Sequence, residues 1–109
     1  MTLELPQPIT GYFAADAHGG ADAVARCFAA GAVVRDEGQT HVGQAAIRSW
    51  KAETGKKYIY TVTPFDITRD SDRIVVTSHL EGDFPGSPVD LRYIFELDGE
   101  MIAALEIIP

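Results

Sequence analysis

Apolar positions recur with helical spacing in the first half of the chain. Ile9, Tyr12 and Phe13 fall at i, i+3 and i+4, with Asp16 at i+7, which predicts a short amphipathic helix that ends at glycines 19 and 20. A second helix is expected over residues 21–30 and is stopped by Gly31. A third is expected over residues 44–55, with its inner face built around Trp50.

Strand patterns fill the second half. Residues 89–97 alternate cleanly between apolar and polar positions, and Asp98–Gly99 is a strong hairpin signal. Pro64 marks a bulge or an edge strand, and the polar residues 37–42 are expected to form a loop. The strands are expected over residues 32–36, 58–63, 73–82, 89–97 and 101–108. Helices followed by a run of antiparallel strands predict an α+β fold with the helices on one face of a curved sheet.

Composition narrows the class of protein. The chain has 109 residues, 46% of them apolar and 23% charged, which fits one globular domain over residues 1–109. Acidic residues outnumber basic ones by 16 to 9, and the basic residues are scattered, so neither nucleic acid nor an anionic membrane is an expected partner. The N-terminus does not resemble a secretion signal and no apolar run reaches about 20 residues, so a soluble, cytoplasmic protein is expected.

The last strand suggests a second copy of the chain. Residues 101–108 are apolar on both faces except at Glu106, whereas a strand covered on one face should alternate. We therefore expect a homodimer through the outer face of the sheet. The alternative is that the chain's own termini cover that face.

Three segments resemble a known family. The chain is similar to the SnoaL-like and ketosteroid-isomerase-like branch of the nuclear transport factor 2 (NTF2-like) superfamily. The matching segments are Cys27-Phe28-Ala29-Ala30-Gly31-Ala32-Val33-Val34-Arg35-Asp36-Glu37-Gly38, Gly43-Gln44-Ala45-Ala46-Ile47-Arg48-Ser49-Trp50 and Asp98-Gly99-Glu100-Met101-Ile102. The resemblance implies a cystatin-like cone, in which three N-terminal helices pack on a strongly bent antiparallel sheet around an apolar pocket, usually in a dimer. The fold hosts isomerases, dehydratases, cyclases, hydrolases and binding proteins.

The resemblance to ketosteroid isomerase implies roles for two residues. The isomerase's oxyanion-donating tyrosine falls on Tyr12 and its catalytic aspartate falls on Asp36, at the same spacing. Its second oxyanion donor falls on Tyr93, and the tyrosine that supports the first donor falls on Lys51, so the network around the oxyanion is not retained.

Each candidate also has a structural interpretation. Asp36 is a general base at the pocket mouth or an acid that ends a strand, and Tyr12 is a donor at the pocket floor or a core tyrosine. His41 shares a proton with Asp36 or is a solvated loop residue. Glu106 is expected on the pocket side of the last strand, or at an edge in water. The expected apolar pocket walls, which are equally good core residues, are Phe28, Trp50, Tyr93 and Phe95.

Other chemistry is not indicated. The three histidines and the single cysteine lack metal-ligand spacing, no phosphate-binding glycine loop is present, and Cys27 is expected to be a buried, inert thiol. We therefore predict a small enzyme without metal or organic cofactor that moves a proton on a small, largely apolar carbonyl compound. The alternatives are a non-catalytic module that binds a small apolar molecule and a dimerisation module.

Overall fold

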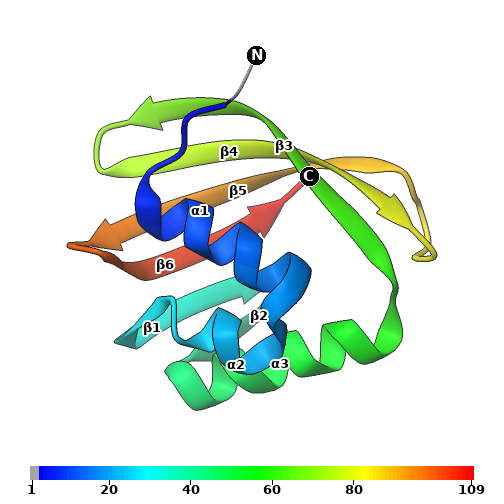
Figure 1. Ribbon diagram of the computed structural model, residues 1–109, viewed down its shortest axis with the longest axis horizontal. Helices are drawn as coiled ribbons and strands as arrows, with labels where there is room; N and C mark the ends of the chain where they lie inside the picture. Colours follow the sequence, from blue (N-terminus) through cyan, green and yellow to red (C-terminus); the bar gives the residue numbers. More distant parts are fainter. Residues whose placement is uncertain (1–2) are drawn as a thin grey trace.

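A six-stranded sheet forms one layer of the protein and the helices cover one of its faces, as the computed structural model of residues 3–109 shows (Figure 1). The strand order is β2-β1-β6-β5-β4-β3. Neighbouring strands are antiparallel except β1 and β6, which are parallel. The strands are β1 (Phe28–Asp36), β2 (Gln39–Val42), β3 (Tyr60–Asp70), β4 (Arg73–Gly82), β5 (Val89–Asp98) and β6 (Met101–Ile108).

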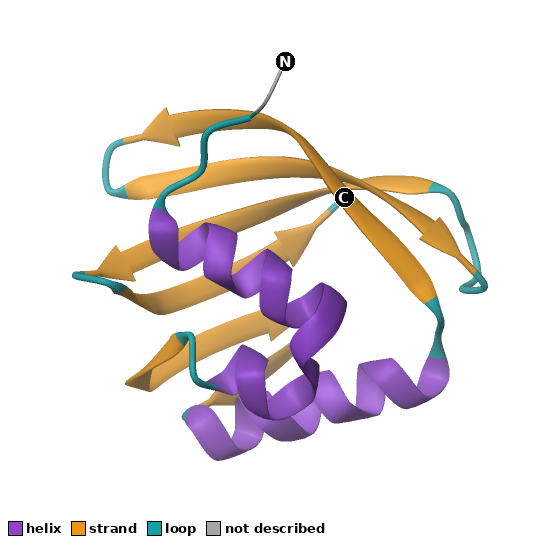
Figure 2. Cartoon of the chain, viewed as in Figure 1, coloured by secondary structure: helices purple, strands orange, loops and turns teal. Residues whose placement is uncertain are grey.

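The helices precede most of the sheet, as expected. The chain runs through α1 (Gln7–Ala14), the π-helical turn η1 (Ala15–Gly19) and α2 (Gly20–Ala25) without a loop, and α3 (Gln44–Lys57) follows β2. The three predicted helices therefore form two separate helical pieces, one of them bent (Figure 2). Gly20 makes the bend, because its φ of 78° lies in the region that favours glycine. No helix in residues 3–109 is long and apolar enough to cross a membrane.

The second helix is shorter than predicted. It ends at Ala25, and Phe28, which falls within the predicted helix, opens β1. Sheet pairing takes over here, because the Ile102 amide donates to the Cys27 carbonyl oxygen at 3.0 Å. A tertiary hydrogen bond thus overrides the helical pattern of the alanine-rich segment.

The predicted loop over residues 37–42 is largely a strand. Asp36 pairs with Gln39, so β1 and β2 are joined by a two-residue turn. Both turn residues, Glu37 and Gly38, have positive φ angles of 53° and 77°, the conformation of a type I′ hairpin. The turn places Asp36 at the last paired position of the hairpin.

Of the later strands, β4, β5 and β6 agree closely with the prediction, whereas β3 continues through Pro64 to Asp70, beyond the expected end at residue 63. β4 and β6 have the predicted bounds, and β3 is an edge strand whose register shifts at Pro64. The core lies between the concave face of the sheet and the helices. Its largest fully buried side chains are Tyr12, Phe28, Phe95, Ile9, Ile47, Ile102 and Leu105.

Candidate functional site

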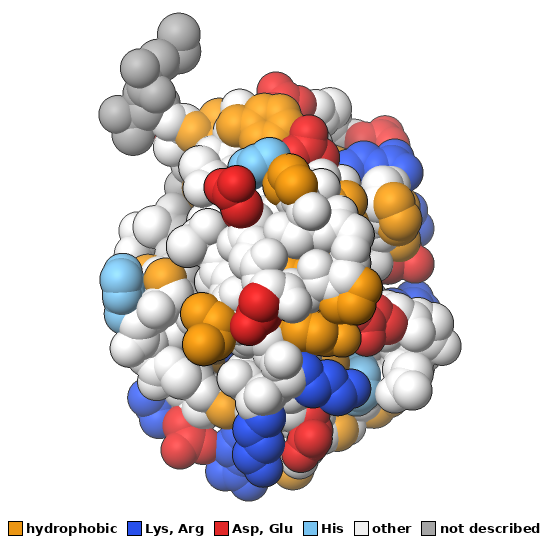
Figure 3. All heavy atoms as spheres, turned by 90° about the vertical axis from the view of Figure 1, so that its right-hand side faces the viewer, with side chains coloured by type: hydrophobic (Ala, Val, Ile, Leu, Met, Phe, Trp, Pro, Cys, Tyr) orange, Lys and Arg blue, Asp and Glu red, His pale blue; other side chains and the backbone are white. Residues whose placement is uncertain are grey.

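A pocket of about 460 Å³ opens between α3, the end of β1 and the concave side of the sheet. Its walls are mainly aromatic and aliphatic, and its charged members are Asp36, Glu37 and Lys51. The end of the molecule that carries the β4–β5 turn and the end of α3 shows exposed apolar side chains among acidic and basic ones (Figure 3). The remaining lining residues include Trp50, Tyr58, Tyr60, Leu80, Phe84, Leu91, Tyr93 and Ile107.

Asp36 reaches the pocket because of its place in β1. Val34 is fully buried on the concave face, and Asp36, two residues further along the strand, follows it on that face beyond the core. The indole nitrogen of Trp50 donates a hydrogen bond to Asp36 Oδ2 at 3.0 Å. One carboxylate oxygen is thus held by α3, and the residue is half-buried in the pocket wall.

Lys51 lies beside Trp50 in a buried ionic cluster. Its Nζ atom is 2.9 Å from Asp16 Oδ1, and both side chains are about nine-tenths buried. The same ammonium donates to the Tyr12 hydroxyl at 3.5 Å and lies 4.3 Å from the centroid of the Trp50 ring. Trp50 therefore contacts both charges, with its N–H edge on Asp36 and its ring face on Lys51.

Three tyrosines near the pocket remain protonated at physiological pH. Burial is the main cause that raises the pKa of Tyr12, Tyr60 and Tyr93, and the negative charge of Asp16 adds to it. Tyr60 and Tyr93 line the pocket, where their neutral phenols are hydrogen-bond donors. Tyr12 is fully buried and is not a lining residue, because its hydroxyl faces Lys51.

His41 contacts Trp50 rather than Asp36. It pairs with Val34 in the β1–β2 ladder, and its ring centroid is 6.0 Å from that of Trp50. It is not a lining residue of the pocket, and within residues 3–109 no hydrogen bond joins it to Asp36. The structure therefore does not bring together the expected Asp36–His41 pair.

The four expected apolar walls divide into two groups. Trp50 and Tyr93 line the pocket, whereas Phe28 and Phe95 are fully buried core residues. The ring of Tyr12 packs against those of Phe28 and Phe95, with centroids 5.9 and 5.6 Å away. Phe28 and Phe95 therefore lie beneath the floor of the site and do not border the cavity.

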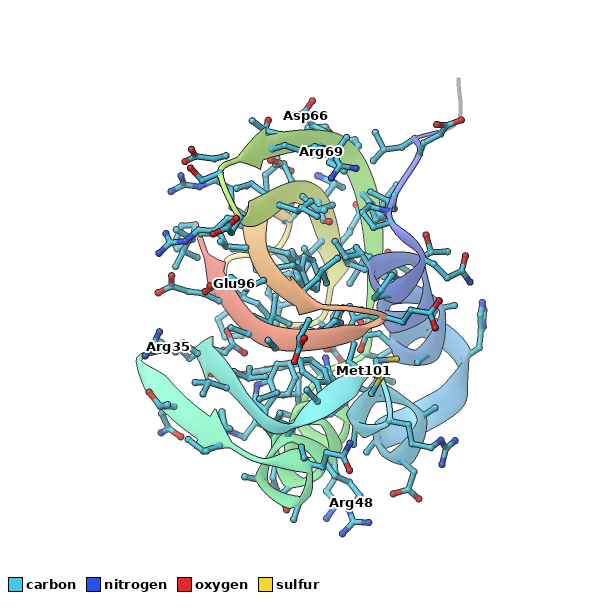
Figure 4. The ribbon with its side chains drawn as sticks, turned by 90° about the vertical axis from the view of Figure 1, so that its left-hand side faces the viewer. Arg35, Arg48, Asp66, Arg69, Glu96 and Met101 are labelled. Atoms are coloured by element: carbon cyan, nitrogen blue, oxygen red, sulfur yellow. The ribbon has the colours of Figure 1, made fainter. Side chains whose placement is uncertain are left out.

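The expected placement of Glu106 on the pocket side is wrong. Glu106 pairs with Ile94 and Arg35, while its neighbour Leu105 pairs with the buried Phe95. Arg35, in register with Glu106, points away from the helices (Figure 4). The cause is a bulge in β6 between Ile102 and Ala104, because one extra residue transfers all later side chains to the opposite face.

Sequence reasoning missed the ionic cluster. In the sequence, Asp16 stands out only as the polar member of an apolar helix stripe, and Lys51 only as a departure from the isomerase pattern. The position of Asp16 on the apolar face that carries Ile9 and Tyr12 could have predicted the cluster. A carboxylate buried on that face needs a cationic partner. The lone Cys27 is half-buried, and burial raises the pKa of its thiol, which disfavours a nucleophilic thiolate.

The bent sheet, the helices on its concave face and the pocket between them define an NTF2-like α+β protein. The chain belongs to the SnoaL-like domain family, whose profile matches residues 9–104. This agrees with the resemblance found in the sequence.

Solved structures agree with this assignment. A protein from Sinorhizobium meliloti with a provisional polyketide cyclase designation is 42% identical, with a TM-score of 0.89 and 94% of each chain covered. A hypothetical protein of ketosteroid isomerase-like fold from Catenulispora acidiphila, in complex with trimethylamine, is 24% identical, with a TM-score of 0.84 over 97% of this chain and 87% of that one. A cystatin-fold protein from Novosphingobium aromaticivorans is 15% identical, with a TM-score of 0.77 over 97% and 100% of the two chains. Among curated proteins, none matches significantly.

Proposed function

We propose that this protein moves a proton on a small, largely apolar carbonyl compound, with Asp36 as the general base and without a metal or organic cofactor. The observation that carries the proposal is the position of Asp36, a carboxylate in an apolar pocket with one oxygen held by the Trp50 indole. Holding one oxygen orients the other for a C–H bond of a ligand, as general-base catalysis requires. The cyclase designation of the Sinorhizobium meliloti relative is consistent with this class of reaction.

The roles of the other candidates follow from their positions. Tyr93, which lines the pocket, is a closer donor to a ligand than Tyr12, whose hydroxyl lies behind Lys51. His41 supports Trp50 through its ring and so acts at most on the position of Asp36. Phe28 and Phe95 shape the floor, whereas Glu106 has no part in the pocket.

Hydrogen–deuterium exchange tests the proposal even when the product is unidentified. The protein is incubated in D₂O with a panel of small cyclic ketones and 1,3-diketones, and exchange beside the carbonyl group is followed by NMR. Asp36→Asn is expected to lower the enzyme-dependent exchange rate about 100-fold or more, because a positioned base contributes at least that much. The amide oxygen of the substituted side chain can still accept from Trp50, so the unfolding temperature should change little.

A matched control removes the same charge elsewhere. Asp90 is exposed and pairs with His79 at 2.8 Å, away from the pocket, so Asp90→Asn should leave exchange unchanged. Exchange that persists in the Asp36→Asn protein would refute the base assignment. A ligand that stabilises both proteins against heat without exchanging its protons would instead favour the non-catalytic binding module, for which the apolar lining is sufficient.

We also infer that two copies associate through the outer face of the sheet. In support, Val75 and Ile94 pair across β4 and β5 on that face and remain partly exposed in the single chain. Glu106 also lies on the outer face, where it is the one charged residue of the otherwise apolar strand β6.

A further inference from the structure

Lys51 is a buried cation that the proposed proton transfer to Asp36 does not use. The residue is 8% exposed, yet it borders the same pocket as Asp36. Burying an ammonium is costly, and a solvent-exposed lysine would serve a surface helix equally well. Lys51 neutralises the buried Asp16 carboxylate, and its place beside the pocket lets the same charge act on a ligand as well.

The hydrogen-bonding capacity of Lys51 is only partly used. An ammonium has three N–H donors; Nζ lies 2.9 Å from Asp16 Oδ1 in an ion pair and donates to the Tyr12 hydroxyl at 3.5 Å. Within residues 3–109, no further acceptor lies within hydrogen-bond distance of Nζ. Because these two groups occupy at most two of the three donors and Lys51 borders the pocket, one donor is left for an acceptor that enters it.

Lys51 and Asp36, which carry opposite charges and both border the pocket, are kept apart. Lys51 forms its ion pair with Asp16 and none with Asp36, although Trp50 contacts both. The indole places the carboxylate at its N–H edge and the ammonium over its ring. A flat ligand that enters between the aromatic walls can thus meet a base and a cation at different atoms.

We propose that Lys51 is a second catalytic residue that binds the oxygen of an enolate, and that the substrates are planar carbonyl compounds with an acidic C–H beside that oxygen. This inference rests on the proposed function of Asp36. The flat class of substrate follows from the aromatic side chains of Trp50, Tyr60, Phe84 and Tyr93 that line the pocket.

The reaction balances without a co-reactant. The Asp36 carboxylate takes the proton as the C–H bond breaks, and the electron pair of that bond becomes the C=C bond of the enolate while the carbonyl oxygen gains the negative charge. Lys51 remains protonated and donates its free N–H to that oxygen, a charge-assisted hydrogen bond stronger in the enolate than in the ketone. Asp36 then returns its proton to a carbon of the enolate, and both residues recover their original state.

A phenolate is a stable probe for this enolate, because it is planar and carries its charge on one oxygen. We would use 4-nitrophenol, whose ionised form absorbs visible light, so that its affinity and its ionisation can both be read in the bound state. The measurement is made in the Asp36→Asn protein, because the uncharged amide stands for the protonated base that faces the enolate. Asp36→Asn should bind the phenolate more tightly than the wild type, whose carboxylate repels it.

The test of Lys51 compares two variants that differ only at that position. Removing Lys51 alone would leave the Asp16 carboxylate buried without a partner, so Asp16→Asn is present in both. The Asp36→Asn/Asp16→Asn protein should bind 4-nitrophenolate about 10-fold more tightly, or better, than the same protein with Lys51→Met, as one charge-assisted hydrogen bond implies. Circular dichroism verifies that both are folded.

The Asp36→Asn protein alone gives a second test that needs no change at Lys51. The bound probe should ionise at a lower pH than the free probe, because the ammonium stabilises its anion. Equal affinity with and without Lys51, ionisation of the bound probe at a higher pH, or no binding of the probe to Asp36→Asn would each overturn the proposal. None of these binding measurements depends on turnover. Their failure would refute the role of Lys51, whereas failure of the exchange experiment would refute the role of Asp36 as the base.

Discussion

Trp50 determines the geometry of the candidate site at the scale of single residues. It donates to Asp36 through its indole nitrogen and lies under the Lys51 ammonium, so one side chain of α3 fixes the positions of both charges. The sequence indicated that Asp36, Trp50 and Tyr93 would meet around a pocket, and all three line it. The partner of Tyr12 could not be predicted, because the direction of the Lys51 side chain depends on how α1 and α3 pack.

Ser78 carries a hydroxyl group that is buried in the core. It is fully buried on the concave face of β4, and within residues 3–109 its hydroxyl has no hydrogen-bond partner. Ser78→Ala removes this unpaired group, so we expect the free energy of unfolding to rise by about 1 kcal/mol in urea denaturation. Ser87→Ala is the matched control. The Ser87 Oγ accepts a hydrogen bond from the Gly82 amide at 2.9 Å, so this change should lower the free energy of unfolding rather than raise it. A loss of stability in Ser78→Ala would show that this hydroxyl is hydrogen-bonded in the folded protein.

At the scale of elements, local irregularities limited what could be predicted. The alternation in β5 gave the correct inner face, since Tyr93 lines the pocket and Phe95 is fully buried. The same parity argument failed in β6, because the bulge after Ile102 has no local signature in a run of apolar residues. The strand β2 was missed because its turn begins with glutamate rather than the asparagine or aspartate that is typical of type I′ hairpins.

The β1–β2 turn should be sensitive to a side chain at Gly38. A Cβ atom at Gly38 would meet nothing within 4 Å, so the cost of Gly38→Ala comes only from its φ of 77°. We expect the free energy of unfolding to fall by about 1 kcal/mol, as is typical of alanine in the left-handed region. Because Asp36 closes this hairpin, the proposed proton exchange should fall as well.

The control for this turn lies in the preceding strand, β1. Gly31 also has open space for an added methyl group and lacks a positive φ, so Gly31→Ala should leave stability unchanged or raise it by a few tenths of a kcal/mol. Denaturation curves of the two variants should therefore differ, with only that of Gly38→Ala moving to lower denaturant concentration. Equal stability of both would mean that the turn adopts another conformation in solution.

At the scale of the whole molecule, the fold was more predictable than the site. The order of elements and the glycine-containing boundaries between them, at Gly43 and Asp98–Gly99, are local features of the sequence. Such local features are sufficient to identify a SnoaL-like chain. The parallel pairing of β1 with β6 joins residues far apart in the sequence, and no local pattern predicts it. The pocket depends on that pairing, because it places the end of β1, with Asp36, beside the C-terminal residues of β6 that line the same cavity.

The outer face of the sheet gives the last prediction. Ile94 is flanked there by Val75 on β4 and by Glu106 on β6, and a polar rim includes Arg35 and Glu96, which point outward in Figure 4. If this apolar centre is the dimer interface, Ile94→Lys places a charge in it, and sedimentation equilibrium should give one chain mass of 11.8 kDa instead of two. Ile59→Lys is the control, because Ile59 is 81% exposed and lies before β3 begins, so it should retain the wild-type mass. A wild-type protein of one chain mass, or an Ile94→Lys protein of two, would exclude this face as the interface. Because Ile94 points away from the pocket, loss of the dimer should leave proton exchange intact and would separate assembly from chemistry in this protein.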